Sequence, residues 1–257
     1  MSRFRVLQFN MQFGQTWSDA DPDRAPIRLD DTLAEIRRHE ADFILLQELE
    51  RAGPAGVQVQ PPLNYTRLCR ELNGYHGWFS YPKADPRELP FGIGLAIFSR
   101  TALQDAFRLE LPSPHIEFNF HGRSTTPTDR VLIGARTSID GRELELLNVH
   151  LLAFFMLGSS STQHPFQRNL VAERLVAARG PTILAGDFNV SRLDTLVQQF
   201  ADKGFTPVQQ TEVTWRRRPY VLDHIFYNSP LRCVAHKVVP TLASDHHALV
   251  ADFEFVD

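Results

Sequence analysis

The sequence has few of the features that mark secreted, membrane-spanning or disulfide-bonded proteins. Its 257 residues contain two cysteines, Cys69 and Cys233, which can form one bridge at most and lack the spacing of a metal site. We expect both to be buried thiols in a reducing cytoplasm. The N-terminal stretch MSRFRVLQFN lacks the apolar core of a secretory signal, and no apolar run is long enough to cross a bilayer. We therefore expect a cytoplasmic protein.

The chain also lacks a strong net charge and any obvious linker. A net charge of -3 gives no general attraction to polyanions, so a nucleic-acid partner would need a local basic patch. No repeat, low-complexity run or Gly/Ser-rich spacer divides the chain, and hydrophobic residues make up 43%, enough for a substantial core. We expect residues 1–257 to form a single globular domain and the protein to be a monomer.

Short apolar strands dominate the pattern, with a few helices between them. The expected strands are residues 4–9, 43–46, 93–98, 131–138, 144–149, 182–185, 221–226 and 248–255. Apolar residues at helical spacing predict helices from 29 to before Asp42, over 63–72 and over 163–178.

Polar side chains follow several of these strands at the point where each strand ends. They are Asn10, Glu48, His150, Asp187 and Asn189. For each residue alone, a turn or a helix cap is the ordinary explanation. Together, carboxylate, amide and imidazole groups at one sheet edge would form an oxygen-rich pocket for a hard divalent cation.

Six short motifs resemble, in this order, those of the endonuclease/exonuclease/phosphatase superfamily. Its members include pancreatic deoxyribonuclease, apurinic endonucleases, neutral sphingomyelinases and inositol polyphosphate 5-phosphatases. The motifs are Asn10 after the first strand, Gln47-Glu48, His150 in LNVHL, Gly186-Asp187-Phe188-Asn189, Leu222-Asp223-His224-Ile225 and Ser244-Asp245-His246. The resemblance covers nearly the whole chain. It implies an α+β fold, a four-layer α/β/β/α sandwich of two mainly antiparallel sheets (DNase I-like). The expected strands agree, because too many are consecutive for a doubly wound parallel sheet.

The chemistry implied by the resemblance is metal-assisted hydrolysis of a phosphate ester by in-line attack of water. Glu48 is the expected main ligand of Mg²⁺, with Mn²⁺ as an alternative. Asn10 and Asp245 are expected to complete the cation site. Magnesium keeps several waters, so this small ligand set is sufficient.

The remaining motif residues are expected to handle the water and the phosphate. Asp187 would orient or deprotonate the attacking water, and Asn189 would hold the water or a phosphate oxygen. His150 and His246 would contact the phosphate, with His246 as general acid or base. Asp223 would fix the tautomer of His246.

Two other histidines are expected to pack and to take no part in the reaction. Adjacent residues on a strand point to opposite faces. His224 should therefore face away from the site that Asp223 serves. His247 should share a face with Leu249 and Phe253.

A basic cluster, Trp215-Arg216-Arg217-Arg218, lies just before the Asp223 strand. In one interpretation Arg217 grips phosphate oxygens and Trp215 stacks a base, because guanidinium groups fit phosphates and indoles stack on bases. In the other, the loop is solvated and Trp215 anchors it to the core. The sequence leaves both open.

The run from Leu151 to Leu157 also has two interpretations. We expect it to continue a buried strand. As an exposed apolar loop it would instead suit a lipid substrate.

We expect the substrate to be a phosphate diester, either nucleic acid or a small organophosphate. A sphingomyelinase-type lipid phosphodiesterase and a phosphomonoesterase are the alternatives. His150 resembles the deoxyribonuclease, sphingomyelinase and phosphatase branches, since the apurinic branch has tyrosine there. A binding module without catalysis is the least favoured, because Glu48, Asp187 and His246 are all present.

Overall fold

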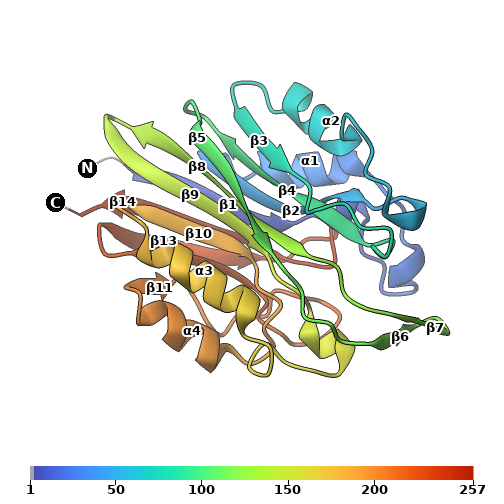
Figure 1. Ribbon diagram of the computed structural model, residues 1–257. Helices are drawn as coiled ribbons and strands as arrows, with labels where there is room; N and C mark the ends of the chain where they lie inside the picture. Colours follow the sequence, from blue (N-terminus) through green and yellow to red (C-terminus); the bar gives the residue numbers. More distant parts are fainter. Residues whose placement is uncertain (1–2, 257) are drawn as a thin grey trace.

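The computed structural model describes residues 3–256, and these form two six-stranded sheets packed face to face with helices outside (Figure 1). The first sheet has the order β13-β14-β1-β2-β4-β3, and the second has the order β11-β12-β10-β9-β8-β5. The strands of the first sheet are, in that order, Leu231–Val239, Ala248–Phe255, Arg3–Asn10, Phe43–Arg51, Gly92–Ser99 and His76–Ser80. Those of the second are Phe205–Pro207, Asp223–Asn228, Thr182–Asp187, Arg142–His150, Arg130–Ile139 and Gln104–Leu111.

Each sheet has one parallel pair of strands at its centre, β1 with β2 and β10 with β9. All other pairings in both sheets are antiparallel. This arrangement confirms the expected α+β sandwich of two mainly antiparallel sheets. The two chain ends of the described part meet in the first sheet, where Leu7 of β1 pairs with Val250 of β14.

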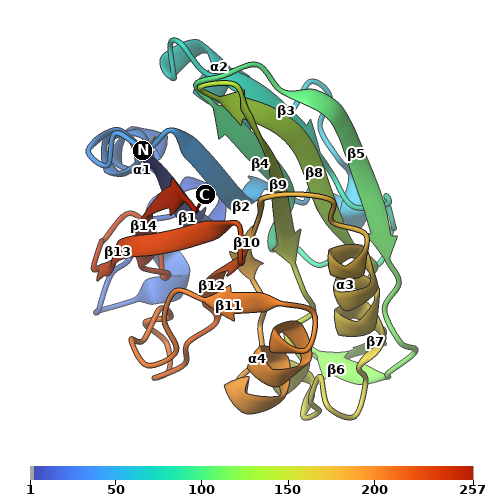
Figure 2. The ribbon, with the colours of Figure 1, turned by 90° about the vertical axis from the view of Figure 1, so that its left-hand side faces the viewer.

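Four helices cover the outer faces of the sandwich (Figure 2). Helices α1 (Leu29–Arg37) and α2 (Leu63–Glu71) pack on the first sheet, and α3 (Phe166–Val176) and α4 (Leu193–Ala201) pack on the second. In β1 the alternation is direct: Val6 belongs to the core between the sheets, whereas Leu7 and Phe9 belong to the core under α1. The sandwich therefore has three apolar layers, one between the sheets and one under each pair of helices.

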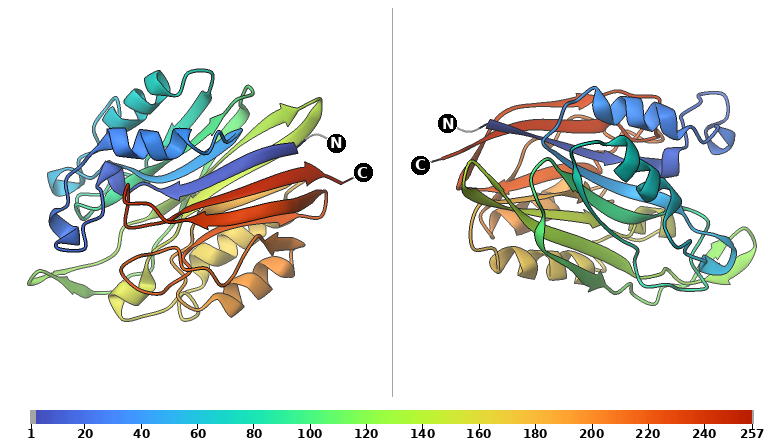
Figure 3. Two further views of the ribbon diagram at one scale, coloured as in Figure 1. Left: turned by 180° about the vertical axis from the view of Figure 1, so that it is seen from behind. Right: turned by 90° about the horizontal axis from the view of Figure 1, so that it is seen from above.

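Polar or irregular segments connect these elements. A small hairpin of β6 (Phe118–Phe120) and β7 (Arg123–Thr125) projects from the body at the end opposite the termini (Figure 1). Views from behind and above show the same separation (Figure 3). Among residues 3–256, no helix has the length and apolar character to cross a membrane; α3 has 11 residues.

Two sequence-based expectations are wrong. The run 151–157 does not continue a strand, because β9 ends at His150 and residues Phe154–Leu157 form a short 3-10 helix, η4. The cysteines are not buried: Cys69 is exposed and Cys233 is half-buried. Only Leu68 of α2 is buried, so Cys69 lies on the exposed part of this helix, whereas Cys233 on the edge strand β13 packs against the rim of the core between the sheets.

Candidate active site

Four of the predicted site residues lie where the two central parallel pairs end. Asn10 ends β1, Asp187 ends β10 and His150 ends β9, while Glu48 lies in β2. In the second sheet Asp187 pairs directly with His150, and in the first sheet Asn10 pairs with Gln47. Both pairs lie at the end of the sandwich away from the termini (Figure 1). The site is therefore shared between the two sheets.

Glu48 reaches this site through an irregularity in β2. Its φ is +53°, and the pairing with β4 shifts register between Gln47 and Glu50. Such a bulge redirects a side chain that regular alternation would turn the other way. Gly92 on β4 leaves the required space, because a Cβ atom there would lie 2.2 Å from Oε2 of Glu48. The strand predicted to stop near Leu46 thus runs on to Arg51, with Glu48 in a strained conformation.

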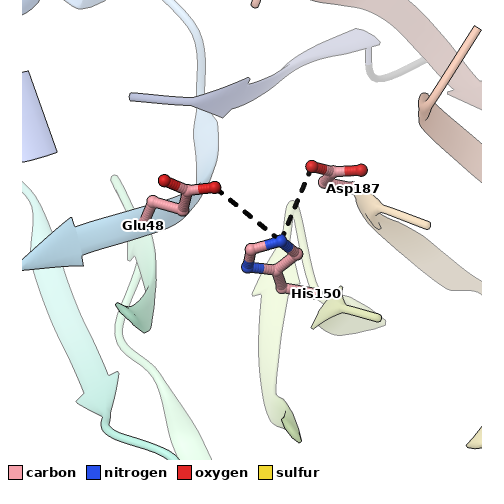
Figure 4. A group of neighbouring side chains, drawn as sticks. All are labelled: Glu48, His150 and Asp187. Atoms are coloured by element: carbon pink, nitrogen blue, oxygen red, sulfur yellow. Dashed lines mark ion pairs between the residues drawn. The ribbon is translucent and has the colours of Figure 1, made fainter. Parts of the chain in front are cut away.

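The side chains of Glu48, His150 and Asp187 point toward one another (Figure 4). Nε2 of His150 lies 3.8 Å from Oε1 of Glu48 and 3.6 Å from Oδ2 of Asp187. Asn10 bridges the two acids, since its Nδ2 donates to Oε1 of Glu48 at 2.9 Å and to Oδ2 of Asp187 at 3.1 Å. Its amide oxygen accepts from the backbone N–H of Gln12 at 3.1 Å. In this arrangement Asn10 acts as a donor between the acids.

The protonation of this cluster departs from that of isolated side chains. Burial and the negative charge of Asp245 raise the pKa of Glu48 to about 7. Burial and the charge of Asp223 raise the pKa of Asp187 well above its usual range. Burial, with the positive charges of Arg130 and His246, lowers the pKa of His150 well below its usual range. Crowded carboxylates of this kind repel one another, so a cation among them would relieve the repulsion.

His246 lies between Asp223 and Asp187 and is hydrogen-bonded to Asp223. Its Nδ1 lies 2.8 Å from Oδ2 of Asp223, and its Nε2 lies 3.8 Å from Oδ2 of Asp187. Burial opposes its charge, but the charge of Asp223 and the hydrogen bond to it, together with Asp187 and Asp245, raise the pKa of His246 to about 10. Ser244 fixes this segment, because its hydroxyl donates to the backbone oxygen of Asn10 at 2.8 Å.

The Gly186-Asp187-Phe188-Asn189 motif has a local steric reason. A Cβ atom at Gly186 would lie 1.9 Å from the backbone oxygen of Val149, so only glycine permits this pairing of β10 with β9. Asn189 follows with φ +51°, and its backbone N–H donates to Oδ1 of Asp187 at 3.0 Å. Its Nδ2 donates to the backbone oxygen of Leu151 at 3.0 Å. Asn189 thus fixes the orientation of Asp187.

Asp245 lies beside His246, and its side chain accepts hydrogen bonds from Trp215 and Arg217 of the basic cluster. Its Oδ2 accepts from Nε of Arg217 at 2.8 Å and from Nε1 of Trp215 at 3.2 Å. Its Oδ1 lies 4.0 Å from Nε2 of His246. Arg217 also pairs with Asp23 at 2.7 Å between Nη1 and Oδ1.

Trp215 is buried, with 7% of its surface exposed, and its ring packs against Phe155, Tyr220 and His246. This matches the interpretation in which Trp215 anchors the loop. The ring surfaces that remain partly exposed beside the site belong to Phe155 and Tyr220.

The other two histidines lie apart from the acids. His224 is fully buried against Phe188 and Phe226, on the outer face of the second sheet. Burial lowers the pKa of His224 to about 4. His247 is half-buried, and its backbone N–H donates to the oxygen of Thr214 at 2.7 Å. The expectation that His224 faces away from Asp223 is confirmed.

Arg130, which the sequence did not single out, borders the site. It begins β8, next to Val131, which pairs with His150, and it lines a small pocket with His150 and Gly92. Its Nη1 lies 3.5 Å from Oε2 of Glu88 and donates to Oγ1 of Thr128 at 3.1 Å. The signal that could have found it is its position, directly before the strand that neighbours the His150 strand.

The donor atoms of the site suit a divalent cation. One ligand atom each from Glu48, His150 and Asp187 lie within 4.8 Å of one another, and so do those of Asp187, Asp223 and His246. Carboxylate oxygens are the ligands that Mg²⁺ and Mn²⁺ prefer, and Glu48 is the acid in these groups with part of its side chain, 17%, exposed. The residues present therefore fit such an ion.

Comparison with known sequences gives two findings. A sequence model of the Endonuclease/Exonuclease/phosphatase family matches residues 7–246. A UPF0294 protein of Yersinia pseudotuberculosis is 33% identical over 120 residues, which are 45% of this chain and 44% of that protein. The match thus spans less than half the length of this relative.

Solved structures share the fold over nearly the whole chain. An endonuclease/exonuclease/phosphatase from Beutenbergia cavernae has a TM-score of 0.74 at 21% identity, covering 99% of this chain and 72% of that chain. D. rerio TDP2, complexed with a single-strand DNA product, has a TM-score of 0.69 at 19% identity, covering 99% of this chain and 100% of that chain. At these identities the likeness concerns the architecture.

Proposed function

Because the chain belongs to the endonuclease/exonuclease/phosphatase family, we propose that it is a divalent-metal-dependent phosphodiesterase that hydrolyses a P–O ester by in-line attack of water. The observation that carries this proposal is the convergence of Glu48, Asp187, His150 and His246 from two sheets onto one end of the sandwich. The acids supply negative charge for a cation and a proton acceptor, and the histidines face an anionic substrate.

In this proposal Glu48 holds Mg²⁺ or Mn²⁺, and Oδ1 of Asp245 borders the same position. Asn10 joins the ligand set only if its amide turns, because its nitrogen faces Glu48 and Asp187. When bound, the cation would supply positive charge against the phosphate oxygens and the leaving oxygen.

Asp187, Asn189, His246 and His150 then act on the water and the phosphate. Asp187, oriented by Asn189, accepts a proton from the attacking water. His246, with its pKa raised to about 10, donates from Nδ1 to Asp223 and directs Nε2–H at the phosphate, where its positive charge stabilises the transition state. His150, whose pKa is lowered, is neutral at pH 7 and contacts a phosphate oxygen by hydrogen bond.

For the substrate, we propose a nucleic acid or a small organophosphate with an aromatic group. Phe155 and Tyr220 offer partly exposed rings next to Trp215 and His246, and aromatic rings stack on bases without sequence preference. Trp215 and Arg217 serve this site by holding Asp245. A lipid diester has less support. The η4 segment exposes one large apolar side chain, Met156 at 62%, which is too little for a lipid-binding surface.

We also infer a cytoplasmic monomer whose whole chain is one catalytic domain. The support for the domain is that the first and last strands of the described part pair with each other, and that both sheets contribute to one site.

A metal-by-substrate screen tests the proposal. Purified protein is assayed with Mg²⁺, Mn²⁺ or EDTA against an aryl phosphodiester, an aryl phosphomonoester, single-stranded DNA, RNA and sphingomyelin vesicles. We expect metal-dependent turnover of the diesters and its loss in His246→Ala. Glu143→Gln, exposed at the other end of the His150 strand, is the control and keeps wild-type turnover. A folded His246→Ala variant with normal turnover would contradict the assignment of His246 to the catalytic site.

A further inference from the structure

Three buried amides lie directly beneath the proposed site and connect the two sheets. Gln8, Gln47 and Asn148 are fully buried, on β1, β2 and β9 respectively. Gln8 precedes Asn10 by two residues, and Asn148 precedes His150 by two, so these two amides each share a strand face with a site residue. The next inward-facing positions, Val6 and Leu146, are already apolar core. The amides therefore form one polar layer between the core and the site.

The hydrogen bonds of this layer form a chain whose direction is fixed at one end. Nδ2 of Asn148 donates to the backbone oxygens of Leu46 at 2.8 Å and Ala96 at 2.9 Å, so Oδ1 of Asn148 must be the acceptor on its other side. Nε2 of Gln47 donates to that oxygen at 2.7 Å.

Oε1 of Gln47 then accepts from Nε2 of Gln8 at 2.7 Å, and the same nitrogen donates to Oδ1 of Asp223 at 2.9 Å. The backbone oxygens of Leu46 and Ala96 in the first sheet thus fix the orientation of all three amides. The last of these amides, Gln8, donates to Asp223 in the second sheet. Turning the Gln8 amide would put its oxygen against two other oxygens, Oε1 of Gln47 and Oδ1 of Asp223.

Gln8 satisfies this chain at a cost. Its Oε1 is buried and has no hydrogen-bond partner among the described residues. A buried unsatisfied acceptor is unfavourable, and apolar residues of similar size occupy the neighbouring inward positions. A glutamine kept here at that cost indicates a requirement for its two N–H donors.

We propose that Gln8, with Gln47 and Asn148 behind it, is a positioning residue for catalysis. It reserves Oδ1 of Asp223 as an acceptor, which leaves Oδ2 to hold the Nδ1 proton of His246 and keeps Nε2 directed at the site. Because these hydrogen bonds cross from the first sheet to the second, they also set Asp223 of β12 in register with Glu48 and Asn10 of the first sheet. This inference rests on the proposed function for its catalytic consequence, but the hydrogen-bond geometry stands apart from any substrate.

Gln8→Leu is the variant that tests this role. We expect kcat for the aryl phosphodiester to fall about 10–100-fold while KM stays within about threefold, as for the loss of an outer partner of a site residue. In an Asp223→Asn background, Gln8→Leu should cost less than about threefold more, because the two residues act through one contact. Full multiplication of the two losses, or an unchanged kcat, would overturn the proposal.

The matched control is Asn228→Ala, at the other end of the Asp223 strand. Asn228 also spans two backbone groups, donating to the oxygen of Gly180 at 2.8 Å and accepting from the N–H of Thr182 at 2.9 Å. We expect it to lower the melting temperature without changing kcat. If Gln8→Leu does not fold, Gln8→Met, which keeps the unbranched shape, takes its place.

A spectroscopic readout separates this proposal from the enzymatic one. In metal-free protein at fixed pH, the ¹H and ¹⁵N shifts of the Nδ1–H group of His246 report its hydrogen bond to Asp223. We expect Nδ1 to be protonated and hydrogen-bonded in the wild type, with that signal shifted or broadened in Gln8→Leu and unchanged in Asn228→Ala. An unchanged signal in Gln8→Leu refutes the positioning role. If the wild type hydrolyses no ester, the proposed function fails, and the ring shifts still decide the role of Gln8.

Discussion

In each sheet a central parallel pair of strands has antiparallel neighbours on both sides, β1–β2 in the first sheet and β10–β9 in the second. The second sheet delivers Asp187 and His150 from the paired last residues of regular strands. The first sheet delivers Asn10 in the same way but Glu48 from a bulge with positive φ. The same strand pattern therefore presents one half of the site by regular alternation and the other half by a local departure from it.

The comparison also separates the chemistry. Glu48 of the first sheet carries the proposed cation, whereas Asp187 and Asp223 of the second sheet act on protons, the latter through His246 from the segment before β14. The predictions below test particular residues of the two sheets.

The largest expected effect comes from comparing Asp187→Asn with Glu48→Gln. Asp187→Asn removes the proton acceptor, so kcat should fall on the order of 10²–10⁴-fold at every Mg²⁺ concentration. Glu48→Gln should instead raise the Mg²⁺ concentration for half-maximal activity by at least the ~10–100-fold that loss of an outer partner costs. Titrations of activity with Mg²⁺ measure both. Equal recovery of the two variants by excess Mg²⁺ would contradict the division between sheets.

Gly92→Ala tests whether the space beside Glu48 is needed for the bulge in β2. The added Cβ would lie 2.2 Å from Oε2 and 2.3 Å from Cβ of Glu48, so the bulge must move. We expect a loss of about 1–3 kcal/mol of stability, typical of overpacking, together with a higher Mg²⁺ concentration for half-maximal activity. Urea unfolding and Mg²⁺ titration measure the two effects.

Gly180→Ala is the control for this change, since a Cβ there has no atom within 4 Å. Should Gly92→Ala keep wild-type metal affinity, the bulge is not what positions Glu48.

His224 reports on the outer face of the second sheet. Burial lowers its folded-state pKa to about 4, below the value of about 6.5 for an unfolded chain, so the unfolded state binds the proton first as pH falls. The stability from the neutral ring is complete above pH 6.5 and is lost between pH 6.5 and 4, by up to about 3 kcal/mol.

His224→Leu should shrink the difference in unfolding free energy between pH 7 and pH 4.5, measured in urea. Part of the difference will remain, because burial also lowers the pKa of His247 to about 4. His76→Gln, exposed on β3, should keep the wild-type difference. A His224→Leu protein with an unaltered pH dependence would show that this ring is not buried neutral.

The smallest expected effect concerns Arg130 at the border between the sheets. Arg130→Gln should raise KM for an anionic diester roughly threefold to tenfold, because a positive charge beside His150 attracts the substrate, and the effect should shrink as salt rises. Arg136→Gln on the same strand, paired with Asp105, is the control. A change in kcat without a change in KM would place Arg130 elsewhere in the reaction.

The second sheet was easier to predict from the sequence than the first. LNVHL and GDFN place polar residues at the ends of apolar strands, so His150 and Asp187 follow from alternation and strand ends alone. Nothing in LLQELE shows that β2 continues through Glu48 with a bulge, because that conformation depends on Gly92 in a different strand. The pattern of residues around Glu48 carries no information about a glycine in another strand.

The edge strands β5 and β13 were missed for a related reason. Most of their residues are at least partly exposed, so their sequences, QDAFRLEL and LRCVAHKVV, lack the apolar pattern that was used to find strands. The anchoring of Trp215 was left open, since its partners, Asp245 and Phe155, come from distant segments.

The pairing of β1 with β14 determines when the active-site cluster of a newly synthesised chain is complete. Ser244, Asp245 and His246 are brought to Asn10 only when Leu249 and Val250 have paired with Gln8 and Leu7. Folds rich in contacts between such distant parts of a chain form slowly. On the ribosome, the segment with Asn10, Glu48 and Asp187 is therefore synthesised well before the histidine that completes the cluster, and a nascent chain stays inert until its final strand has emerged.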